Sequence, residues 1–286
     1  MLPVLAKLIK LTIVTTILFN FSQASGQRWE IGGLIGGINY TGDLAKDPIL
    51  SQTRLGINLW GRYNLNRHFS YRFGGAYGRI QGHDSLTPSG KIRMLSFRTP
   101  IVEFSNIIEF HFKPFGRYHP QNKKFTYYVL TGLNLFYFKP EGSFDGTWVD
   151  LQKLGTEGQY LEGGKGGYGR INVSIPIGAG IKYRVGNWIY GFEVAYRKTF
   201  TDYLDDVSGN YPDLNELGAK NGATAVYFSD PTTRRPGLEP RSVKNDMRGD
   251  PHLKDWYIFA GFTISYRFTP IMCVFQPRAK RFSRID

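Results

Sequence analysis

Residues 169–213 read GRINVSIPIGAGIKYRVGNWIYGFEVAYRKTFTDYLDDVSGNYPD, and this stretch decides the fold. From Ile171 to Tyr183 every second residue is apolar, and most residues between are polar or glycine, which is the period of a β-strand. The alternation resumes at Trp188 after a tight turn around Gly186. The two runs predict a hairpin with roughly a dozen residues per strand, longer than the strands of soluble sheets. Strands of this length, apolar on one face and rich in aromatic residues, are typical of outer-membrane β-barrels.

The same alternation recurs along the chain. It predicts six further strands, in segments 29–40, 54–64, 69–79, 102–112, 125–138 and 255–268. Together with the hairpin they make eight strands, an even number, as a closed antiparallel barrel requires. We therefore predict an all-β fold: an eight-stranded antiparallel transmembrane β-barrel over residues 27–268, similar to OmpA and OmpX, with long extracellular loops.

The connections differ in length, and this difference predicts the orientation. Those near Asn66, Lys113 and Gly186 are shorter than the others, which include a glycine-rich loop of about thirty residues before Gly169 and a polar insertion from Thr201 to Leu253. Short connections of outer-membrane barrels are periplasmic and long ones are extracellular. We therefore expect both ends of the barrel to lie in the periplasm.

The N-terminal segment indicates export. Lys7 and Lys10 precede an apolar run, and Ala24, Ser25 and Gly26 provide small residues before a cleavage point. This layout predicts a secretory signal peptide over residues 1–26, because the apolar run is too short to span a membrane as a helix. The expected location is the cell outer membrane.

The net charge of +13 has two interpretations. A basic excess often indicates nucleic-acid binding, but an exported protein rarely meets nucleic acid. We favour basic residues that face anionic lipopolysaccharide and line the barrel. Aromatic residues make up 15% of the chain and glycines number 34, which suits a small barrel with aromatic girdles and crowded strands.

Charged residues of both signs fall on the polar face of the predicted strands. An eight-stranded barrel is just wide enough to be filled by its own side chains, and an unpaired charge inside it would be costly. We therefore predict paired charges and a plugged barrel without a pore. The residues expected inside are Glu30, Arg62, Arg72, Glu103, Glu109, Lys182, Arg184, Glu193, Arg197 and Arg267.

The sequence contains no zinc-ligand spacing, nucleophile elbow, phosphate loop or dinucleotide fingerprint, so we expect neither an enzyme nor a cofactor. Some small outer-membrane barrels are lipid-modifying hydrolases with a histidine, a serine and a carboxylate near the rim. His111, Glu109 and Ser105 share one face and superficially resemble such a set. Because that face is the lumenal one, packing inside the barrel is the favoured interpretation.

An aspartate-rich motif lies between the hairpin and the polar insertion. Its residues could hold calcium, although their spacing does not match an EF-hand loop. Aspartate, glycine and proline also favour turns, and turn formation is the favoured hypothesis. The motif residues are Asp202, Asp205, Asp206, Asn210 and Asp213.

Four segments resemble the PorG family of Bacteroidota outer-membrane β-barrels, which are components of the type IX secretion system. They are WEIGGLIGGINYTGDL (29–44), LGTEGQ (154–159), SIPIGAGIKYRV (174–185) and YRKTFTDYLDDVSGNYPD (196–213). The resemblance covers nearly all the chain after the predicted signal. The last segment is the most specific, because glycine-rich opening strands such as the first are common.

The resemblance implies a non-enzymatic barrel that associates with a periplasmic ring of a PorK-type lipoprotein and a PorN-type protein. That ring belongs to the machinery that exports proteins with a C-terminal sorting domain, and it is tied to motility in gliding species. Two other functions stay open: a lipid-A-modifying enzyme, and a structural barrel of the OmpA or OmpX type that binds no ring.

The last segment, 269–286, is expected to be a periplasmic tail that binds the partner. PorG-like chains end in a cysteine and a short basic tail, and here the tail is longer. A lone Cys273 in an oxidising compartment predicts an intermolecular disulfide or a reactive thiol. A shielded cysteine that acts as a small hydrophobic residue is the alternative. The candidate contact residues are Cys273, Arg278, Lys280 and Arg281.

Overall fold

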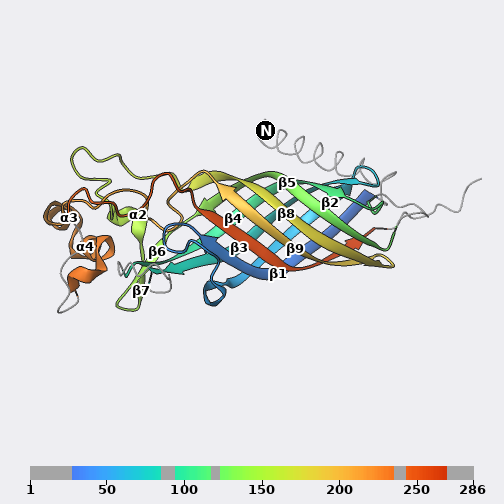
Figure 1. The fold of residues 1–286 in the computed structure, drawn as a ribbon, viewed down its shortest axis with the longest axis horizontal. Coiled ribbons are helices and arrows are strands. Elements are labelled where there is room, and N and C mark those ends of the chain that lie inside the picture. Colours follow the sequence, from blue (N-terminus) through green and yellow to red (C-terminus); the bar gives the residue numbers. More distant parts are fainter. Residues whose placement is uncertain (1–27, 85–93, 117–122, 235–242, 269–286) are drawn as a thin grey trace, which may run out of the picture.

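The computed structural model describes residues 28–84, 94–116, 123–234 and 243–268, and its long strands close into a barrel (Figure 1). The predicted signal peptide and the tail, with Cys273, Arg278, Lys280 and Arg281, lie outside the described residues. The eight barrel strands are β1 (Trp29–Thr41), β2 (Arg54–Asn64), β3 (Phe69–His83), β4 (Ser96–His111), β5 (Phe125–Phe138), β8 (Ile171–Val185), β9 (Trp188–Thr199) and β10 (Trp256–Arg267). The predicted strand number is confirmed, while β3 and β4 extend further than the sequence pattern indicated.

Each barrel strand pairs antiparallel with its neighbours, and β1 pairs with β10 to close the ring. At this seam Gly36 lies opposite Gly261. A Cβ atom on Gly36 would lie 2.1 Å from the carbonyl oxygen of Ala260, so a larger residue would force the two strands apart. The glycines that make β1 an unusual strand thus allow the first and last strands to meet.

The outer surface of the barrel is an apolar belt. Outward-facing residues are strongly exposed: Ile171 to 66%, Leu59 to 65% and Phe262 to 72%. Along each strand they alternate with residues that point into the lumen. Aromatic pairs lie near the end with the short turns, including Trp188 with Tyr266 at a centroid distance of 5.1 Å. An outward apolar band with an aromatic girdle belongs in lipid. The protein is a β-barrel of the outer-membrane type.

The half of the lumen near the short turns is ionic. Glu109 is fully buried and contacts Arg62 at 3.0 Å and Arg72 at 3.1 Å. Lys182 also pairs with Glu109. Arg72 forms a second pair with Glu193 at 2.7 Å. The predicted pairing of lumenal charges is therefore confirmed for these residues, and their side chains fill the barrel.

Of the remaining predicted lumenal charges, four form further pairs, while Arg184 is only partly buried and lies over the ring of Phe115 at 5.9 Å. Glu30 bridges Arg62 and Arg267, each at 2.6 Å, next to the seam. Glu103 accepts a hydrogen bond from Tyr257 at 2.6 Å and lies 3.4 Å from Arg197. The charges therefore occur in chains of alternating sign.

The other half of the lumen is mainly apolar, with the Glu103–Arg197 pair at its border. Buried aromatic side chains from several strands fill it and continue into the loops above the barrel. This core includes Ile38, Tyr40, Phe97, Ile101, Phe136, Phe138, Tyr257 and Phe259. Leu204, Val207 and Phe228 from the long connections pack against it. The barrel interior thus changes from ionic to apolar along its axis.

The long connections gather at one end of the barrel and the short ones at the other (Figure 1). They are more structured than the glycine-rich loop and polar insertion expected from the sequence. The first contains β6 (Glu141–Phe144), β7 (Thr147–Asp150) and α2 (Leu151–Leu154), and the second contains α3 (Leu214–Asn221), α4 (Ala223–Ser229) and a 3-10 turn, η4 (Pro231–Arg234). A 3-10 turn, η2 (Leu50–Gln52), precedes β2. Within the described segments no helix is long and apolar enough to cross a membrane.

We predict that Glu109→Ala destabilises the barrel strongly. Breaking a buried ion pair typically costs about 3–5 kcal/mol, because the partner charge is left buried and uncompensated, and Glu109 has three cationic partners. The midpoint of urea unfolding in detergent, followed by the shift between folded and unfolded bands on unheated gels, should fall. Glu162→Ala, at an exposed loop position, is the control and should unfold as the wild type does. An unchanged midpoint for Glu109→Ala would refute the stabilising role of this network.

Candidate functional site

Three connections meet at the end of the barrel that carries the helices, and we call their described residues the loop assembly: 42–53, 139–170, 200–234 and 243–255. Three of the four motif segments singled out in the sequence reach this assembly. Segment 29–44 enters it from β1, segment 154–159 follows α2, and segment 196–213 leaves β9. Although they are far apart in sequence, side chains of the first two segments both contact the last one there.

The first contact centres on the hydroxyl group of Tyr40, at the end of β1. This oxygen lies 2.6 Å from Asp205 Oδ2 and 3.0 Å from Asp255 Oδ1, and all three side chains are buried. A phenol has one proton and can donate to only one carboxylate at a time. A second proton, on one of the two carboxyl groups, completes both short contacts. Tyr40 thus joins the aspartate motif to the residue that precedes β10.

Backbone groups hold the two carboxylates in place. The amide of Val207 donates to Asp205 Oδ1 at 2.9 Å, and the amide of Leu204 donates to Asp255 Oδ2 at 2.8 Å. The space around Tyr40 is tight, because a Cβ atom on Gly42 would lie 2.1 Å from both the Tyr40 hydroxyl oxygen and Asp255 Oδ1. A glycine after Thr41 is therefore required for this arrangement.

The second contact joins Asp206 to the first long connection. Asp206 adopts a left-handed backbone conformation with φ +64°. Its carboxylate accepts hydrogen bonds from the hydroxyls of Thr156 and Tyr168, both at 2.6 Å. The ring of Tyr168 also stacks on Tyr203 at a centroid distance of 4.2 Å. Asp205 and Asp206 therefore point to different partners on different loops.

A buried ion pair provides the third contact. Glu157 accepts hydrogen bonds from the amides of Ser208 and Gly209, at 2.9 and 3.0 Å. Arg248 lies 2.9 Å from Glu157 and donates to the carbonyl oxygen of Asp206 at 2.6 Å. The sequence analysis missed both residues. Glu157 lies within LGTEGQ and could have been suspected, whereas nothing in the sequence around Arg248 predicts its burial.

The five motif residues do not form one ligand set. Asp213 is the N-cap of α3 and accepts from the amides of Asn215 and Glu216. Asn210 is exposed and pairs with Met247 in an isolated β-bridge. Among the described residues no group of three or more His, Cys, Asp or Glu is placed to hold a metal ion. Formation of a helix cap explains the position of Asp213. It does not explain Asp205 and Asp206, whose carboxylates connect separate loops.

Burial sets the protonation of the site. It raises the pKa of Asp205 and Asp255 well above the usual aspartate value, and the negative charge of Asp202 adds to the effect on both. Burial also raises the pKa of Asp202 to about 7, and that of Asp206 to about 6 despite the opposing charge of Arg248. The higher pKa values agree with the extra proton that the geometry around Tyr40 requires.

The predicted hydrolase-like set lies elsewhere, inside the barrel. His111 Nε2 is 3.4 Å from Glu109 Oε2 and 3.1 Å from Lys182 Nζ. The hydroxyl of Ser105 instead contacts the carbonyl oxygen of Gly74. All are buried, so the interpretation of this set as lumenal packing is confirmed.

We predict that the loop assembly loosens as pH rises. Four buried aspartates, Asp202, Asp205, Asp206 and Asp255, have higher pKa values in the folded state than the ordinary value of 3.8, so the folded form binds protons more tightly than the open form. Their stabilising contribution is fully present below about pH 4 and declines as pH rises through 6 and 7. Hydrogen-exchange protection of residues 200–213, corrected for intrinsic rates, should fall across this range.

Asp205→Asn should flatten this pH dependence, because it removes one of the two carboxyl groups that contact the Tyr40 hydroxyl. Asp213→Asn is the matched control within the same motif, since asparagine is an equally good helix N-cap. Protection that is independent of pH in the wild-type protein would contradict a protonated site.

Solved structures that are similar to this chain at low identity include the following three proteins. Ail, the attachment invasion locus protein of Yersinia pestis, is 12% identical with a TM-score of 0.37, over 84% of this chain and 98% of Ail. Neisserial surface protein A (NspA) is 12% identical with a TM-score of 0.36, over 85% and 98% of the two chains. OprG from Pseudomonas aeruginosa is 10% identical with a TM-score of 0.37, over 86% and 98%.

No curated protein matches the sequence. A family model does match, over residues 9–227, which include seven of the eight barrel strands and the aspartate motif. The chain therefore belongs to the family described as a domain of unknown function, DUF6089.

Proposed function

We propose that this chain is a non-enzymatic outer-membrane component of the type IX protein secretion system, as its PorG-like segments imply. One observation carries the proposal: three of those segments meet in the loop assembly. Tyr40 of the first contacts Asp205 of the last, and Thr156 of the second contacts Asp206. The residues behind the resemblance thus form one buried structure.

The filled lumen supports a role in which the barrel acts through its two ends. Ion pairs around Glu109 occupy one half, and aromatic side chains such as Phe136 and Tyr257 occupy the other. A substrate protein could not pass through a barrel whose interior is packed with its own side chains. The protein would then contribute to export by binding other components of the machinery.

The proposed partners are the PorK-type lipoprotein and PorN-type protein of a periplasmic ring. β1 begins and β10 ends at the short-turn end of the barrel (Figure 1). The tail that follows β10 would therefore enter the periplasm if the long loops are extracellular. Cys273, Arg278, Lys280 and Arg281 would be its contacts, with the basic residues meeting an acidic surface of the ring.

A lipid-A-modifying activity requires a catalytic set on the outer rim, within reach of lipid. Ser105 and His111 are six positions apart on β4, which corresponds to roughly 20 Å along a strand, and both are buried in the lumen. This arrangement favours the export role over the enzymatic one.

Deletion of the gene should abolish type IX export and leave lipid A unchanged. Cargo proteins with a C-terminal sorting domain should disappear from the culture medium and accumulate inside the envelope, because an assembled machine lacks one of its outer-membrane parts. Immunoblots of medium and periplasm measure the first effect, and mass spectrometry of lipid A the second. The wild-type gene supplied in trans should restore secretion. Normal secretion in a clean deletion strain would exclude the proposed function.

The orientation can be tested on whole cells. An epitope in the connection between β9 and β10 should be accessible to antibody in intact cells, since long connections are expected outside. An epitope after Asp286 should react only after the outer membrane is permeabilised. Labelling of the C-terminal epitope in intact cells would reverse the proposed topology.

A further inference from the structure

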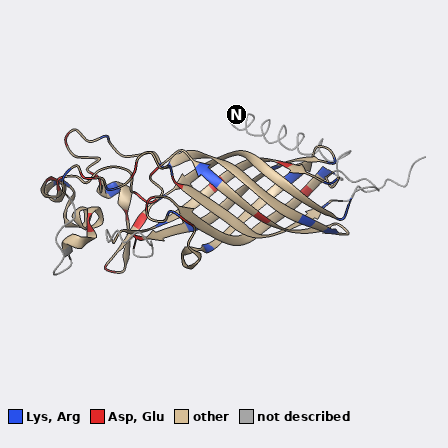
Figure 2. Cartoon of the chain, in the orientation of Figure 1, with Lys and Arg blue, Asp and Glu red and all other residues tan. Residues whose placement is uncertain are grey.

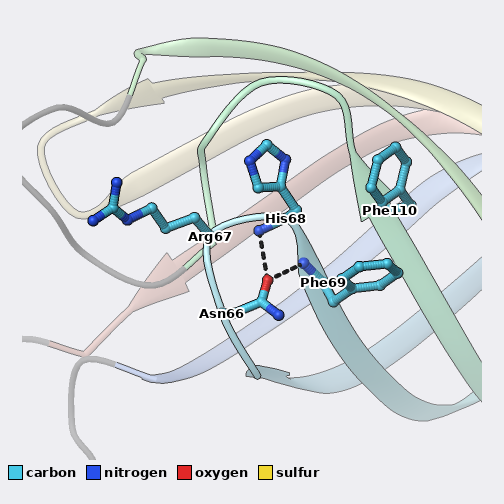
Figure 3. A pocket seen from close by; sticks show the side chains of 5 residues that line it. All are labelled: Asn66, Arg67, His68, Phe69 and Phe110. Atoms are coloured by element: carbon cyan, nitrogen blue, oxygen red, sulfur yellow. Dashed lines mark hydrogen bonds between the residues drawn. The ribbon is translucent and has the colours of Figure 1, made fainter.

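We propose that a recess at the short-turn end of the barrel binds the phosphate headgroup of an anionic phospholipid from the adjacent leaflet. This inference does not depend on the proposed role in export. The recess lies at the turn between β2 and β3 and is shown in Figure 3. Its lining residues are Asn66, Arg67, His68, Phe69 and Phe110.

Hydrogen bonds fix the backbone of this turn and leave the Arg67 side chain exposed. Asn66 Oδ1 accepts from the amides of His68 and Phe69, both at 2.8 Å. The carbonyl oxygen of Arg67 accepts from the amides of Phe115 and Gly116, at 2.8 and 3.0 Å. The backbone is thus fixed from both sides, while the Arg67 side chain is exposed and extends away from the turn (Figure 3).

His68 forms one wall of the recess, and a hydrogen bond fixes the tautomer of its neutral ring. Its Nδ1 atom lies 2.7 Å from the carbonyl oxygen of His111. Because a carbonyl oxygen can only accept, the hydrogen must be on Nδ1. The ring stacks against Phe110 at a centroid distance of 6.0 Å, so its orientation is fixed beside the recess.

Phe69 and Phe110, which line the recess, begin a continuous strip of aromatic rings on the lipid-facing surface. Phe69 is 42% exposed and lies 5.1 Å from Phe110, measured between ring centroids. Phe110 lies 5.2 Å from Phe112, and Phe112 stacks on Tyr127 at 4.8 Å. Such a strip can contact the upper part of an acyl chain, where aromatic side chains are usually found in membrane barrels.

Lys113 places a second cation at the end of this strip. Its Nζ atom lies 5.4 Å from the ring centroid of Phe125 and 5.7 Å from that of Tyr127. Both rings are on the outer face of the barrel. A lysine that lies over lipid-facing aromatic rings is at the depth of the headgroups, where long basic side chains reach toward phosphate.

The described connections at this end have charges of one sign only. The described residues of its connections, 65–68, 112–116, 123–124 and 186–187, include no aspartate or glutamate. Arg67, Lys113, Lys123 and Lys124 are exposed there, whereas charges of both signs occur in the loop assembly (Figure 2). An acidic protein would also be complementary, but the cations next to the aromatic strip favour a ligand that has both a phosphate and an apolar chain.

Native mass spectrometry of the full chain in detergent tests this assignment. With phosphatidylglycerol and phosphatidylcholine supplied at equal concentration, the wild-type protein should retain phosphatidylglycerol several-fold more. The double variant Arg67→Ala/Lys113→Ala should retain the two lipids equally. Lys198→Ala is the matched control, because Lys198 lies over Trp256 in the same way, 5.6 Å from its ring, at the other end of the barrel. Heat-dependent gel mobility confirms that each variant is folded.

Several results would overturn the proposal. Equal retention of both lipids by the wild-type protein would do so, as would a preference that survives in the double variant or is lost equally in Lys198→Ala. Displacement of the lipid by millimolar inorganic phosphate would indicate a free-phosphate site. Binding of a polyglutamate peptide that requires Arg67 and Lys113, without any lipid preference, would assign this surface to an acidic protein partner.

Discussion

The carboxylate of Glu109 is the constraint on which the barrel interior depends. It lies on β4, and its cationic partners come from β2, β3 and β8, so one side chain connects strands around the circumference of the ring. Inside a barrel, water cannot replace a missing partner, and each charge stays only because another faces it. The geometry of four strands is thus coupled through a single residue.

The ionic half of the lumen contrasts with the apolar half, and this division determines how the loops fold. If the lumen beneath the long connections were polar, these connections would have no apolar surface to pack on. The buried rings of Phe136, Phe138 and Phe259 provide such a surface. Leu204 and Val207 pack against these rings and hold the backbone between them in place. The intervening aspartates are then buried, which explains why their carboxyl groups need partners and a proton.

The sequence predicted what depends on local period and missed what depends on distant contacts. Alternation in segments such as Ile171–Val185 is sufficient to predict the number of strands and the face on which each side chain lies. Successive side chains of a strand point to opposite faces, so the polarity of each residue indicates whether it faces lipid or lumen. The apolar lumen was not recognised, since Tyr257 and Phe259 alternate with Trp256 and Ile258, which gives an apolar residue on both faces.

The contacts of the loop assembly could not be predicted from local sequence patterns, because they join residues that are distant in the chain. Tyr40 meets Asp255 across 215 positions of the chain, and Arg248 contacts Glu157, which is 91 positions away. The aspartate motif was identified as a unit, yet its members serve three separate contacts. Composition could not distinguish these roles, because each is defined by a partner on another loop.

The position of Tyr40 beside the seam has a consequence for how the barrel closes. β1 and β10 are the first and last strands, so their pairing needs both ends of the barrel sequence and no hairpin turn dictates its register. A shift of one residue would turn Tyr40 from the interior to the lipid side. Its hydrogen bonds to Asp205 and Asp255 would then be lost, and two buried carboxyl groups would keep only their backbone amide donors. The same three side chains that join the loops therefore also discriminate correct from incorrect closure of the ring.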